Sequence, residues 1–292
     1  MDITLNSQPL VSVYIPSKNR QKLLALAIES ITKQSYQNIE ILVVDDGSTD
    51  DTFEYLQSLT QHMPNLRIFK NKKSLGACAS RNLAIEHAKG EFVTGLDDDD
   101  LFLPERISSL VSAYDDRYAF ICSSAIWDYG NRTRIIDRLE TEVTLDKQLS
   151  YNEATSQVLV KKERIINIGG FDESFVACQD YDLWTRLIIE YGSAYRIGEP
   201  SYVVNDTGSS QRMISNPNSV KGYEQYFEKH GHLMSGTNIL NQEFMRLRRC
   251  NEVMSLGQLI RHIGQGYFYS KLRYYLSSNF SFIRMLHRKY YK

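Results

Sequence analysis

The sequence lacks the features that hold small extracellular domains together. Its four cysteines, Cys78, Cys122, Cys178 and Cys250, lie far apart and form no C-x-x-C pair. This spacing argues against a disulfide framework and against a zinc knuckle. No window approaches the roughly 18 apolar residues of a membrane-spanning helix, and residues 1–9 lack the basic and apolar segments of a signal peptide. We therefore expect free thiols in a reducing cytoplasm, and a chain that is soluble or lies on a membrane without crossing it.

No charge of one sign dominates the chain, but the charges are unevenly distributed. The 292 residues include 34 Lys and Arg against 35 Asp and Glu, and 42% are hydrophobic, which excludes a disordered tail and a collagen-like repeat. Residues 240–292 carry ten basic and two acidic side chains (+8), which leaves 24 and 33 for residues 1–239 (−9). The two parts are expected to meet different partners. The length predicts one large domain with an appendage, or two packed lobes.

Strand-like and helix-like patterns alternate along the first third of the chain. Strands are expected at 10–15, 39–44, 66–69 and 91–96, and helices at 20–33, at 48–59 with Ser48, Thr49 or Asp50 as the cap, and at 76–88. Gly90 is expected to close the last helix in the left-handed conformation that glycine tolerates. Such alternation is typical of βαβ units, whose crossovers place helices on both faces of a parallel sheet. The prediction is an α/β fold.

The rest of the chain mixes strands with short helices and ends in helices. The expected elements are a helix after Pro104 to 114, a strand at 118–124, a hairpin turn at 129–131 before a partner segment at 133–139, a strand at 156–160, and helices at 162–167, 180–191 and from 218 onward. The helix at 180–191 has an apolar stripe formed by Leu183, Trp184, Leu187 and Ile188.

Polar side chains follow the ends of three predicted strands. They are the Pro-Ser pair at 16–17, the Asp-Asp pair at 45–46 and four aspartates at 97–100. In such sheets ligands bind outside the carboxyl ends of the strands, so one crevice can collect all three. A hard divalent cation, with a nucleotide diphosphate as its co-ligand, would balance four adjacent carboxylates. The alternative is a solvated loop whose acids, Asp100 in particular, cap the helix near Pro104.

Two further residues fit the same crevice. Asp46 can accept hydrogen bonds from a nucleobase or a ribose, and Arg81 offers a guanidinium fork that suits phosphate oxygens. Taken singly, Asp46 is equally consistent with a turn or a helix cap, and Arg81 with a surface charge. Their order along the chain, together with the acidic run, favours a nucleotide site.

Six motifs follow one another in a specific order over roughly residues 10–205. They are V-S-V-Y-I-P-S-K-N-R (11–20), V-V-D-D-G-S (43–48), A-S-R-N (79–82), G-E-F-V-T-G-L-D-D-D-D (90–100), G-G-F-D-E (169–173) and Q-D-Y-D-L-W-T-R-L (179–187). The ordered set resembles family 2 glycosyltransferases of the GT-A fold. The resemblance implies a Rossmann-like mixed sheet flanked by helices. It also implies inverting sugar transfer from a nucleotide-activated donor, usually UDP-linked, with Mn²⁺ or Mg²⁺.

The resemblance assigns roles to residues that would bind the nucleotide. Asp46 resembles the family's uracil-binding acid, with the backbone around Pro16 and Ser17 beside the base. Arg81 would lie near the nucleotide.

It also assigns a metal site and a catalytic base. Asp97 and Asp99 match the ends of the D-x-D motif, Asp99 as the best metal ligand, while Asp97 or Asp98 would reach the ribose or a metal-bound water. Asp180 matches the general base, which the acceptor hydroxyl needs because it is a poor nucleophile. The alternative for Asp180 is the cap of its own helix. Attack opposite the diphosphate would turn an α-linked donor into a β-glycoside.

The sequence departs from the family pattern at two places. Gln179 stands where relatives often have Glu, which removes a charge but keeps a hydrogen-bonding side chain. Many relatives also supply a histidine after the last core strand, and this chain has none between His87 and His230. The candidates to replace that metal or phosphate contact are Asn205, Asp206 and Arg212.

Aromatic and basic residues are interleaved in residues 264–292. They include Tyr267, Phe268, Tyr269, Lys271, Arg273, Tyr274, Tyr275, Phe280, Phe282, Arg284, Arg288, Lys289, Tyr290, Tyr291 and Lys292. Such a segment suits an anionic membrane surface, and we expect peripheral docking on the inner face of the cytoplasmic membrane. The alternative is a helical appendage that packs on the core or on a second copy of the chain in a homodimer. Nucleic acid binding is not expected, because nothing outside this segment is basic.

The sequence therefore predicts a GT-A catalytic domain at 1–215 and a helical C-terminal region at 216–292. Within the domain, residues from about 10 to 115 would bind the nucleotide and 116–215 the acceptor. The expected reaction adds one sugar to a saccharide acceptor, lipid-linked through a polyprenyl diphosphate, in surface polysaccharide (O-antigen or capsule) synthesis. The spanning helices and Q-x-x-R-W motif of processive synthases are missing. The alternatives are an inactive sugar-nucleotide-binding module and a metal-dependent nucleotidyltransferase.

Overall fold

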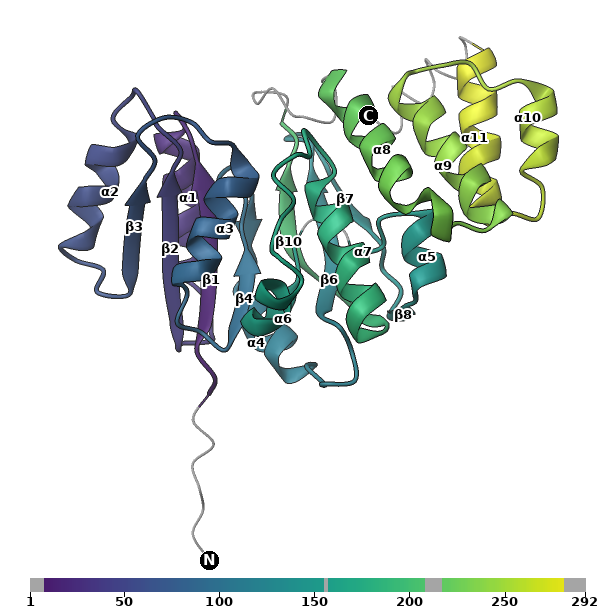
Figure 1. Cartoon of the computed structure of the whole chain (residues 1–292). Helices are drawn as coiled ribbons and strands as arrows, with labels where there is room; N and C mark the ends of the chain where they lie inside the picture. Colours follow the sequence, from purple (N-terminus) through teal and green to yellow (C-terminus); the bar gives the residue numbers. More distant parts are fainter. Residues whose placement is uncertain (1–7, 155–156, 208–216, 281–292) are drawn as a thin grey trace, which may run out of the picture.

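The fold is a mixed β-sheet with helices on both faces, followed by a group of C-terminal helices (Figure 1). It was obtained as a computed structural model, which describes residues 8–154, 157–207 and 217–280. The strands are β1 (Val11–Ser17), β2 (Ile39–Asp45), β3 (Leu66–Lys70), β4 (Phe92–Gly95), β5 (Leu101–Phe102), β6 (Ile121–Asp128), β7 (Thr133–Ile136), β8 (Thr141–Val143), β9 (Leu159–Lys161) and β10 (Ala194–Asn205).

The helices match most of the predicted ones. They are α1 (Gln21–Thr32), α2 (Thr52–Thr60), α3 (Ala77–His87), α4 (Arg106–Ser112), α5 (Leu145–Ser150), α6 (Lys162–Asn167), α7 (Gln179–Tyr191), α8 (Pro217–His230), α9 (Gly236–Arg249), α10 (Leu256–Arg261) and α11 (Phe268–Asn279). The structure adds elements that the sequence pattern did not indicate, namely β5, β8, β10 and α5.

The sheet joins a parallel half to an antiparallel one. Its order is β3-β2-β1-β4-β9-β6-β10-β5, with β7 paired to β6 and β8 to β10. Strands β3, β2, β1 and β4 are mutually parallel, as predicted, whereas β9 runs antiparallel to both β4 and β6. The carboxyl ends of β1 and β2 coincide, since Ser17 pairs with Asp45.

Alternation along the strands divides the core between the two faces of the sheet. In β1, Val13 and Ile15 belong to the cluster that contains Leu24 of α1, whereas Tyr14 belongs to the opposite cluster. The apolar stripe of α7 also packs there, through Trp184 and its neighbours. The period-2 and helical patterns therefore predicted the buried sides correctly.

The prediction for Gly90 was wrong. Helix α3 ends at Ala88 in an extended conformation, and Gly90 is not among the glycines with positive φ. Its role is close approach instead, because a Cβ built there would lie 2.5 Å from Ser12 Oγ and 2.7 Å from the Leu10 carbonyl oxygen. The missing side chain lets the turn before β4 lie against β1.

The C-terminal helices pack on the sheet domain through specific contacts (Figure 1). Gln242 of α9 donates to the Tyr181 hydroxyl (2.8 Å), and Asn238 donates to Ser150 Oγ (2.8 Å). Lys271 is completely buried and donates to Asn241 Oδ1 (2.6 Å). This part of the basic segment therefore packs inward and does not face a membrane.

The aromatic residues of the segment differ in their surroundings. Tyr267 donates its hydroxyl hydrogen to Glu153 Oε1, and Tyr274 donates to the Glu252 carbonyl oxygen. In contrast, Tyr269 is 86% exposed. The predicted positions from Phe282 to Lys292 lie outside the described residues.

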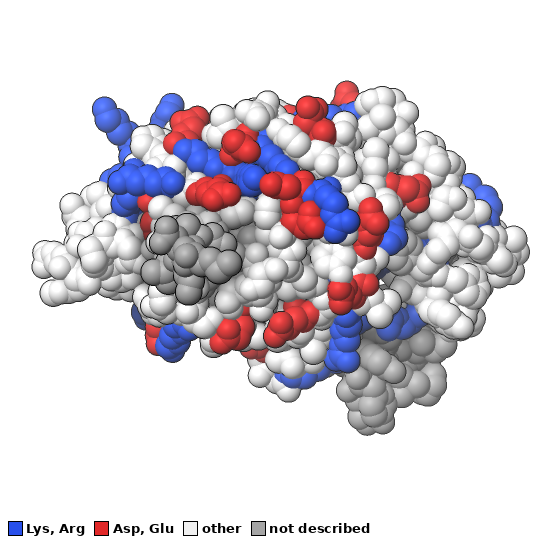
Figure 2. Space-filling model, turned by 90° about the horizontal axis from the view of Figure 1, so that it is seen from below, with Lys and Arg blue, Asp and Glu red and all other residues white. Residues whose placement is uncertain are grey.

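The end of the molecule at which the parallel strands begin is shown in Figure 2, where acidic and basic side chains are interspersed. Among the described residues seen on this face, basic side chains alternate with acidic ones and form no broad basic area. No helix within residues 8–154, 157–207 and 217–280 is long and apolar enough to cross a bilayer.

Candidate active site

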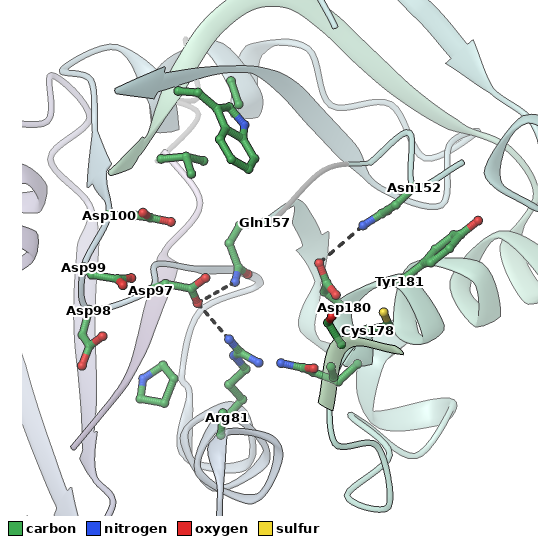
Figure 3. Close-up of a pocket in the computed structure, with 18 of the residues that line it drawn as sticks. Arg81, Asp97, Asp98, Asp99, Asp100, Asn152, Gln157, Cys178, Asp180 and Tyr181 are labelled. Carbon is green, nitrogen blue, oxygen red and sulfur yellow. Dashed lines mark hydrogen bonds and ion pairs between the residues drawn. The ribbon is translucent and has the colours of Figure 1, made fainter. Parts of the chain in front are cut away.

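A cleft of about 620 Å³ opens at the carboxyl ends of β1, β2 and β4. It brings together the eight residues that the family motifs assigned to the nucleotide, the metal or the catalytic base: Pro16, Ser17, Asp46, Arg81, Asp97, Asp98, Asp99 and Asp180. In Figure 3 the acidic run lies on one side and Asp180 on the other, with Arg81 and Gln157 between them. The expectation of one shared hollow is therefore confirmed.

The chain itself supplies positive charge to the acidic run. Arg20 Nη1 lies 2.9 Å from Asp98 Oδ1 and 3.1 Å from Asp99 Oδ2, and Ser17 Oγ donates to Asp98 at 2.7 Å. Burial raises the pKa of Asp98, and the Arg20 charge opposes that rise. Sequence analysis missed Arg20, although it stands in the segment that follows the first strand.

Asp100 has a structural role that differs from the expected one. Its Oδ1 accepts the backbone N–H of Asn205 at 2.9 Å, which links the acidic run to the end of β10. Helix α4 begins only at Arg106. Asp100 therefore anchors a strand, and the proposed helix cap was wrong.

Arg81 is buried and points into the cleft, so its interpretation as a surface charge was wrong. It is 6% exposed, and its Nη2 lies 2.8 Å from Asp97 Oδ1. Burial disfavours the charged guanidinium, but the Asp97 carboxylate outweighs this and raises the pKa of Arg81. Its Nε and Nη1 are buried without a hydrogen-bond partner among the described residues. The Arg81 side chain therefore lines the cleft, while these two nitrogens are enclosed within the protein.

Gln157 holds Asp97 from the other side and is itself fixed by a buried arginine. Gln157 Nε2 donates to Asp97 Oδ1 at 3.2 Å. Arg106, which is fully buried, donates from Nη2 to the Gln157 carbonyl oxygen at 3.0 Å. The Arg106 guanidinium also lies 4.7 Å and 4.9 Å from the ring centroids of Phe102 and Tyr202. Burial lowers the pKa of Arg106 to about 10, so the group still carries its charge at neutral pH.

Asp46 accepts four hydrogen bonds from the loop before α3. The donors are Asn71 Nδ2 (2.8 Å), Ser74 Oγ (2.6 Å), and the backbone N–H groups of Leu75 (2.8 Å) and Gly76 (3.0 Å). Burial acts to raise the pKa of Asp46, but these hydrogen bonds outweigh it and lower the pKa. Asp46 is therefore ionised and holds the β2 end against this loop, and its contact with uracil stays a prediction.

Asp180 lies at the second residue of α7 and faces the cleft. Cys178 holds the N-cap position in the left-handed conformation (φ 60°), so the helix cap is not Asp180. Burial raises the pKa of Asp180 to about 6, while hydrogen bonds from the first-turn backbone and the Arg81 charge limit that rise. Asn152 Nδ2 lies 3.4 Å from Asp180 Oδ2. A carboxylate that titrates near neutral pH can accept a proton from a hydroxyl.

The candidates to replace the missing histidine do not line the described part of the cleft. Asn205 donates its N–H to Asp100 and accepts from the Thr207 N–H at 3.3 Å. Among the described residues the cleft is lined by Val204 but not by Asn205 or Asp206. Arg212 lies outside the described residues.

The donor set suits a cation that also binds a ligand's phosphates. Within residues 8–154, 157–207 and 217–280, no three His, Cys, Asp or Glu side chains could hold a metal ion by themselves. The hydrogen bonds to Asp97 fall on Oδ1, and Oδ2 accepts none from the described residues. One or two carboxylates, with phosphates and water completing the shell, are what Mg²⁺ typically uses.

Residues from the C-terminal helices also line the cleft. They are Ser219 and Tyr223 of α8, and Met245 and Arg249 of α9. The membrane, core or second-copy contacts were predicted for residues 264–292, and no part in the site was predicted for residues 217–249. The residues follow the acidic run by more than a hundred positions, and no local pattern marks them.

Comparisons with known proteins agree with this geometry. Residues 12–177 match the family model described as Glycosyl transferase family 2, and residues 122–235 match one described as Glycosyltransferase like family 2.

Among curated relatives, the Escherichia coli K12 protein WcaA, assigned as a colanic acid biosynthesis glycosyl transferase, is 32% identical over 77% of this chain and 83% of its own length. The Campylobacter jejuni GalNAc(5)-diNAcBac-PP-undecaprenol beta-1,3-glucosyltransferase is 31% identical over 62% of this chain and 60% of its own.

Among solved structures, Staphylococcus aureus TarS 1-349 in complex with UDP-GlcNAc has a TM-score of 0.63 at 18% identity, over 95% of this chain and 83% of that one. The Pyrobaculum calidifontis mannosyltransferase PcManGT, in complex with GDP-Man and Mn²⁺, has a TM-score of 0.59 at 18% identity, over 98% and 89%. These likenesses show the predicted GT-A fold.

Proposed function

Because the chain belongs to glycosyltransferase family 2, we propose that it moves one sugar from a UDP-sugar to a hydroxyl of a saccharide acceptor, with inversion. The observation that carries the proposal is the single cleft between the acidic run and Asp180 (Figure 3). One side offers charge and hydrogen-bond donors for a nucleotide diphosphate. The other offers a base for the attacking hydroxyl.

The donor half would be bound by residues that the chain already holds in place. Pro16 and Ser17 would contact the base beside Asp46, and Asp97 or Asp98 would reach the ribose. The guanidinium of Arg81, which lines the cleft, suits phosphate oxygens, since charge-assisted hydrogen bonds to phosphate are strong.

The metal would be Mn²⁺ or Mg²⁺, held by Asp99 and Asp97 together with the donor phosphates. When bound, it supplies charge neutralisation to the leaving diphosphate. Removal of divalent ions with EDTA is expected to stop transfer, and added Mn²⁺ or Mg²⁺ to restore it.

Asp180 would take the proton from the acceptor hydroxyl. With a pKa of about 6 it is mostly ionised at pH 7 and still basic enough to accept a proton in the transition state. Its position across the cleft from Asp97 (Figure 3) suits attack on the face opposite the leaving diphosphate. An α-linked donor would therefore yield a β-glycoside.

The acceptor we propose is a glycan linked to a polyprenyl diphosphate, in the synthesis of a surface polysaccharide such as O-antigen or capsule. Support comes from the relatives, two of which are named for glycans on undecaprenyl diphosphate. The protein would then work in the cytoplasm, on the inner face of the cytoplasmic membrane.

The face proposed to touch the membrane is formed by α10 and the turn that follows it. Leu256, Ile260 and Ile263 are 57%, 57% and 58% exposed and follow at helical spacing. Flotation with anionic vesicles is expected to be reduced by the double substitution Ile260→Glu/Ile263→Glu and unaffected by Leu26→Glu on α1. Equal flotation would contradict membrane docking, and a change of oligomeric state instead would indicate a homodimer.

Transfer assays with Asp180→Asn test the proposed chemistry. The assay supplies UDP-sugars and Mn²⁺ and follows released UDP. Loss of a general base is expected to reduce turnover about 10²–10⁴-fold, with UDP affinity nearly unchanged. Release of diphosphate in place of UDP would indicate a nucleotidyltransferase. If the wild type binds a UDP-sugar but forms no product, the protein would be an inactive sugar-nucleotide-binding module.

A screen of UDP-sugars by thermal stabilisation with Mn²⁺ identifies the donor most directly, because a ligand bound only by the folded state raises its apparent stability.

A further inference from the structure

An arginine of the C-terminal region lies in the cleft and has no acidic partner in the part of the chain that the structure describes. Arg249, the last residue of α9, lines the cleft together with Tyr223 of α8. The neighbouring basic residues on this region are paired, Arg246 with Glu252 and Arg261 with Glu243. Among the described residues no ion pair is formed by Arg249. Its charge is therefore available to a ligand.

The side chain is held by an aromatic ring. The guanidinium carbon of Arg249 lies 4.1 Å from the centroid of the Tyr223 ring, and Tyr223 is only 7% exposed. A cation over a ring face is attracted by the ring quadrupole, and stacking restricts a long side chain that would otherwise be mobile. The guanidinium fork is thus positioned before any ligand arrives.

Arg249 belongs to the acceptor side of the cleft. The charges of both Arg249 and Asp180 act on the thiol of Cys178, which lies two residues before Asp180. By contrast, the guanidinium groups on the donor side are each paired with the acidic run, Arg20 with Asp98 and Asp99, and Arg81 with Asp97. Among the described guanidinium groups that line the cleft, the one without an ion pair is therefore Arg249, on the side formed by the C-terminal helices.

We propose that Arg249, stacked on Tyr223, binds the phosphate group that joins the acceptor sugar to its carrier. This inference rests on the proposed function, because it names the group next to the sugar that Asp180 would activate. A planar guanidinium binds phosphate oxygens through two parallel N–H bonds, which gives orientation as well as affinity. Holding the phosphate here would fix which end of the acceptor enters the cleft.

Binding of geranyl diphosphate, a short and soluble prenyl diphosphate, tests the subsite in the full chain with the donor site saturated by UDP and Mn²⁺. Arg249→Gln is expected to weaken this binding about tenfold or more, the effect of losing one charge-assisted contact. Arg249→Lys keeps the charge but loses the planar guanidinium. Its affinity for geranyl diphosphate is expected to lie between those of the wild type and Arg249→Gln. The matched control is Arg248→Gln, an exposed residue that does not line the cleft, which should bind like the wild type.

Other probes give outcomes that would overturn the inference. If Arg249→Gln weakened the binding of galacturonate but not that of geranyl diphosphate, the ligand of Arg249 would be a sugar carboxylate. Equal weakening of UDP by Arg249→Gln would make Arg249 a donor residue. No binding of geranyl diphosphate by the wild type, or equal binding by the variant, would exclude the subsite. If the wild type releases no UDP from any UDP-sugar, the proposed function fails instead, and the two failures are distinguishable.

Discussion

At the scale of single residues, the site depends on how the cleft sets the charge of each group. Asp46 is kept ionised by four donors, and Arg81 by the carboxylate that it contacts. Asp180 differs, because burial raises its pKa to about 6. A group with this pKa changes its charge within an accessible pH range, so its role can be tested by titration.

The rate of transfer is expected to follow the ionisation of Asp180. The base acts only when deprotonated, so kcat/KM should be half its maximum near pH 6 and fall about tenfold for each further pH unit below that. The measurement is initial rate against pH at low acceptor concentration. Circular dichroism at each pH checks that the protein remains folded. A rate that stays constant down to pH 4.5 would contradict the assignment of the base.

The same burial makes Asp180 costly for stability. Its pKa rises from 3.8 in the unfolded chain to about 6 in the folded one, so ionisation favours unfolding. The destabilisation by the Asp180 charge is therefore absent below pH 3.8, grows between pH 3.8 and pH 6, and is complete above pH 6.

Asp180→Asn is therefore expected to raise the free energy of unfolding by about 1–3 kcal/mol at pH 7, and to lose that gain near pH 4. Urea unfolding at both pH values measures it. Asp115→Asn is the control, because the pKa of exposed Asp115 is lowered by Arg117 and its removal should bring no gain. An equal gain at both pH values would show that ionisation is not the cause.

At the scale of elements, α8 is positioned by a glycine. Gly222 lies in α8, and a Cβ built on it would lie 2.6 Å from the Ala177 carbonyl oxygen and 2.7 Å from Ala177 Cβ. The helix can therefore approach the segment that leads into α7 and Asp180. The next residue, Tyr223, is the ring that holds Arg249.

Gly222→Ala is expected to destabilise the protein by about 1–3 kcal/mol, because backbone must move, and to weaken acceptor binding more than UDP binding. Gly257→Ala on α10 is the matched control. Its Cβ would meet only Ser255 Oγ, at 4.0 Å, so the better helix propensity of alanine should leave stability equal or raise it by up to about 1 kcal/mol. Chemical denaturation and calorimetric titration measure the two effects. Equal stability of the two variants would show that the approach of α8 is not tight.

At the scale of the whole molecule, the C-terminal helices complete the cleft. Helix α9 is hydrogen-bonded to α5 and to Tyr181 of α7, and it carries Arg249 into the site. A chain ended near Ser235 would remove these contacts together with any membrane-binding surface. Such a truncation therefore does not isolate the membrane contribution.

Truncation after Ser235 is expected to lower the melting temperature by roughly 5 °C or more and to abolish transfer even with a water-soluble acceptor. The full-length Ile260→Glu/Ile263→Glu variant serves as the comparison, since it should keep both properties while floating less with vesicles. A truncated protein that melted and transferred like the full chain would show that α9 is dispensable for the site.

Much of the nucleotide half could be predicted from the sequence. Local hydrophobic periodicity predicts the alternation of β1, α1, β2, α2 and the following elements. Parallel strands then bring their carboxyl ends to one edge of the sheet. That is why Ser17, Asp46 and the acidic run were correctly expected to share one cleft with Arg81.

Other features required the tertiary structure. The antiparallel pairing of β9 and the pairing of β10 depend on strands that are distant in the chain, and local periodicity does not identify those partners. Whether Gly90 was a helix end or a point of close approach depended on Ser12, which lies on another strand.

The sequence by itself thus determined the residue types at the strand ends and the chemistry open to them, because short-range pattern and covalent order decide both. Only the tertiary structure decided which guanidinium groups neutralise the acidic run, how far burial shifts Asp180, and that Arg249 reaches the same cleft. Charge balance and burial are sums over neighbours in space, and those neighbours come from every part of the chain.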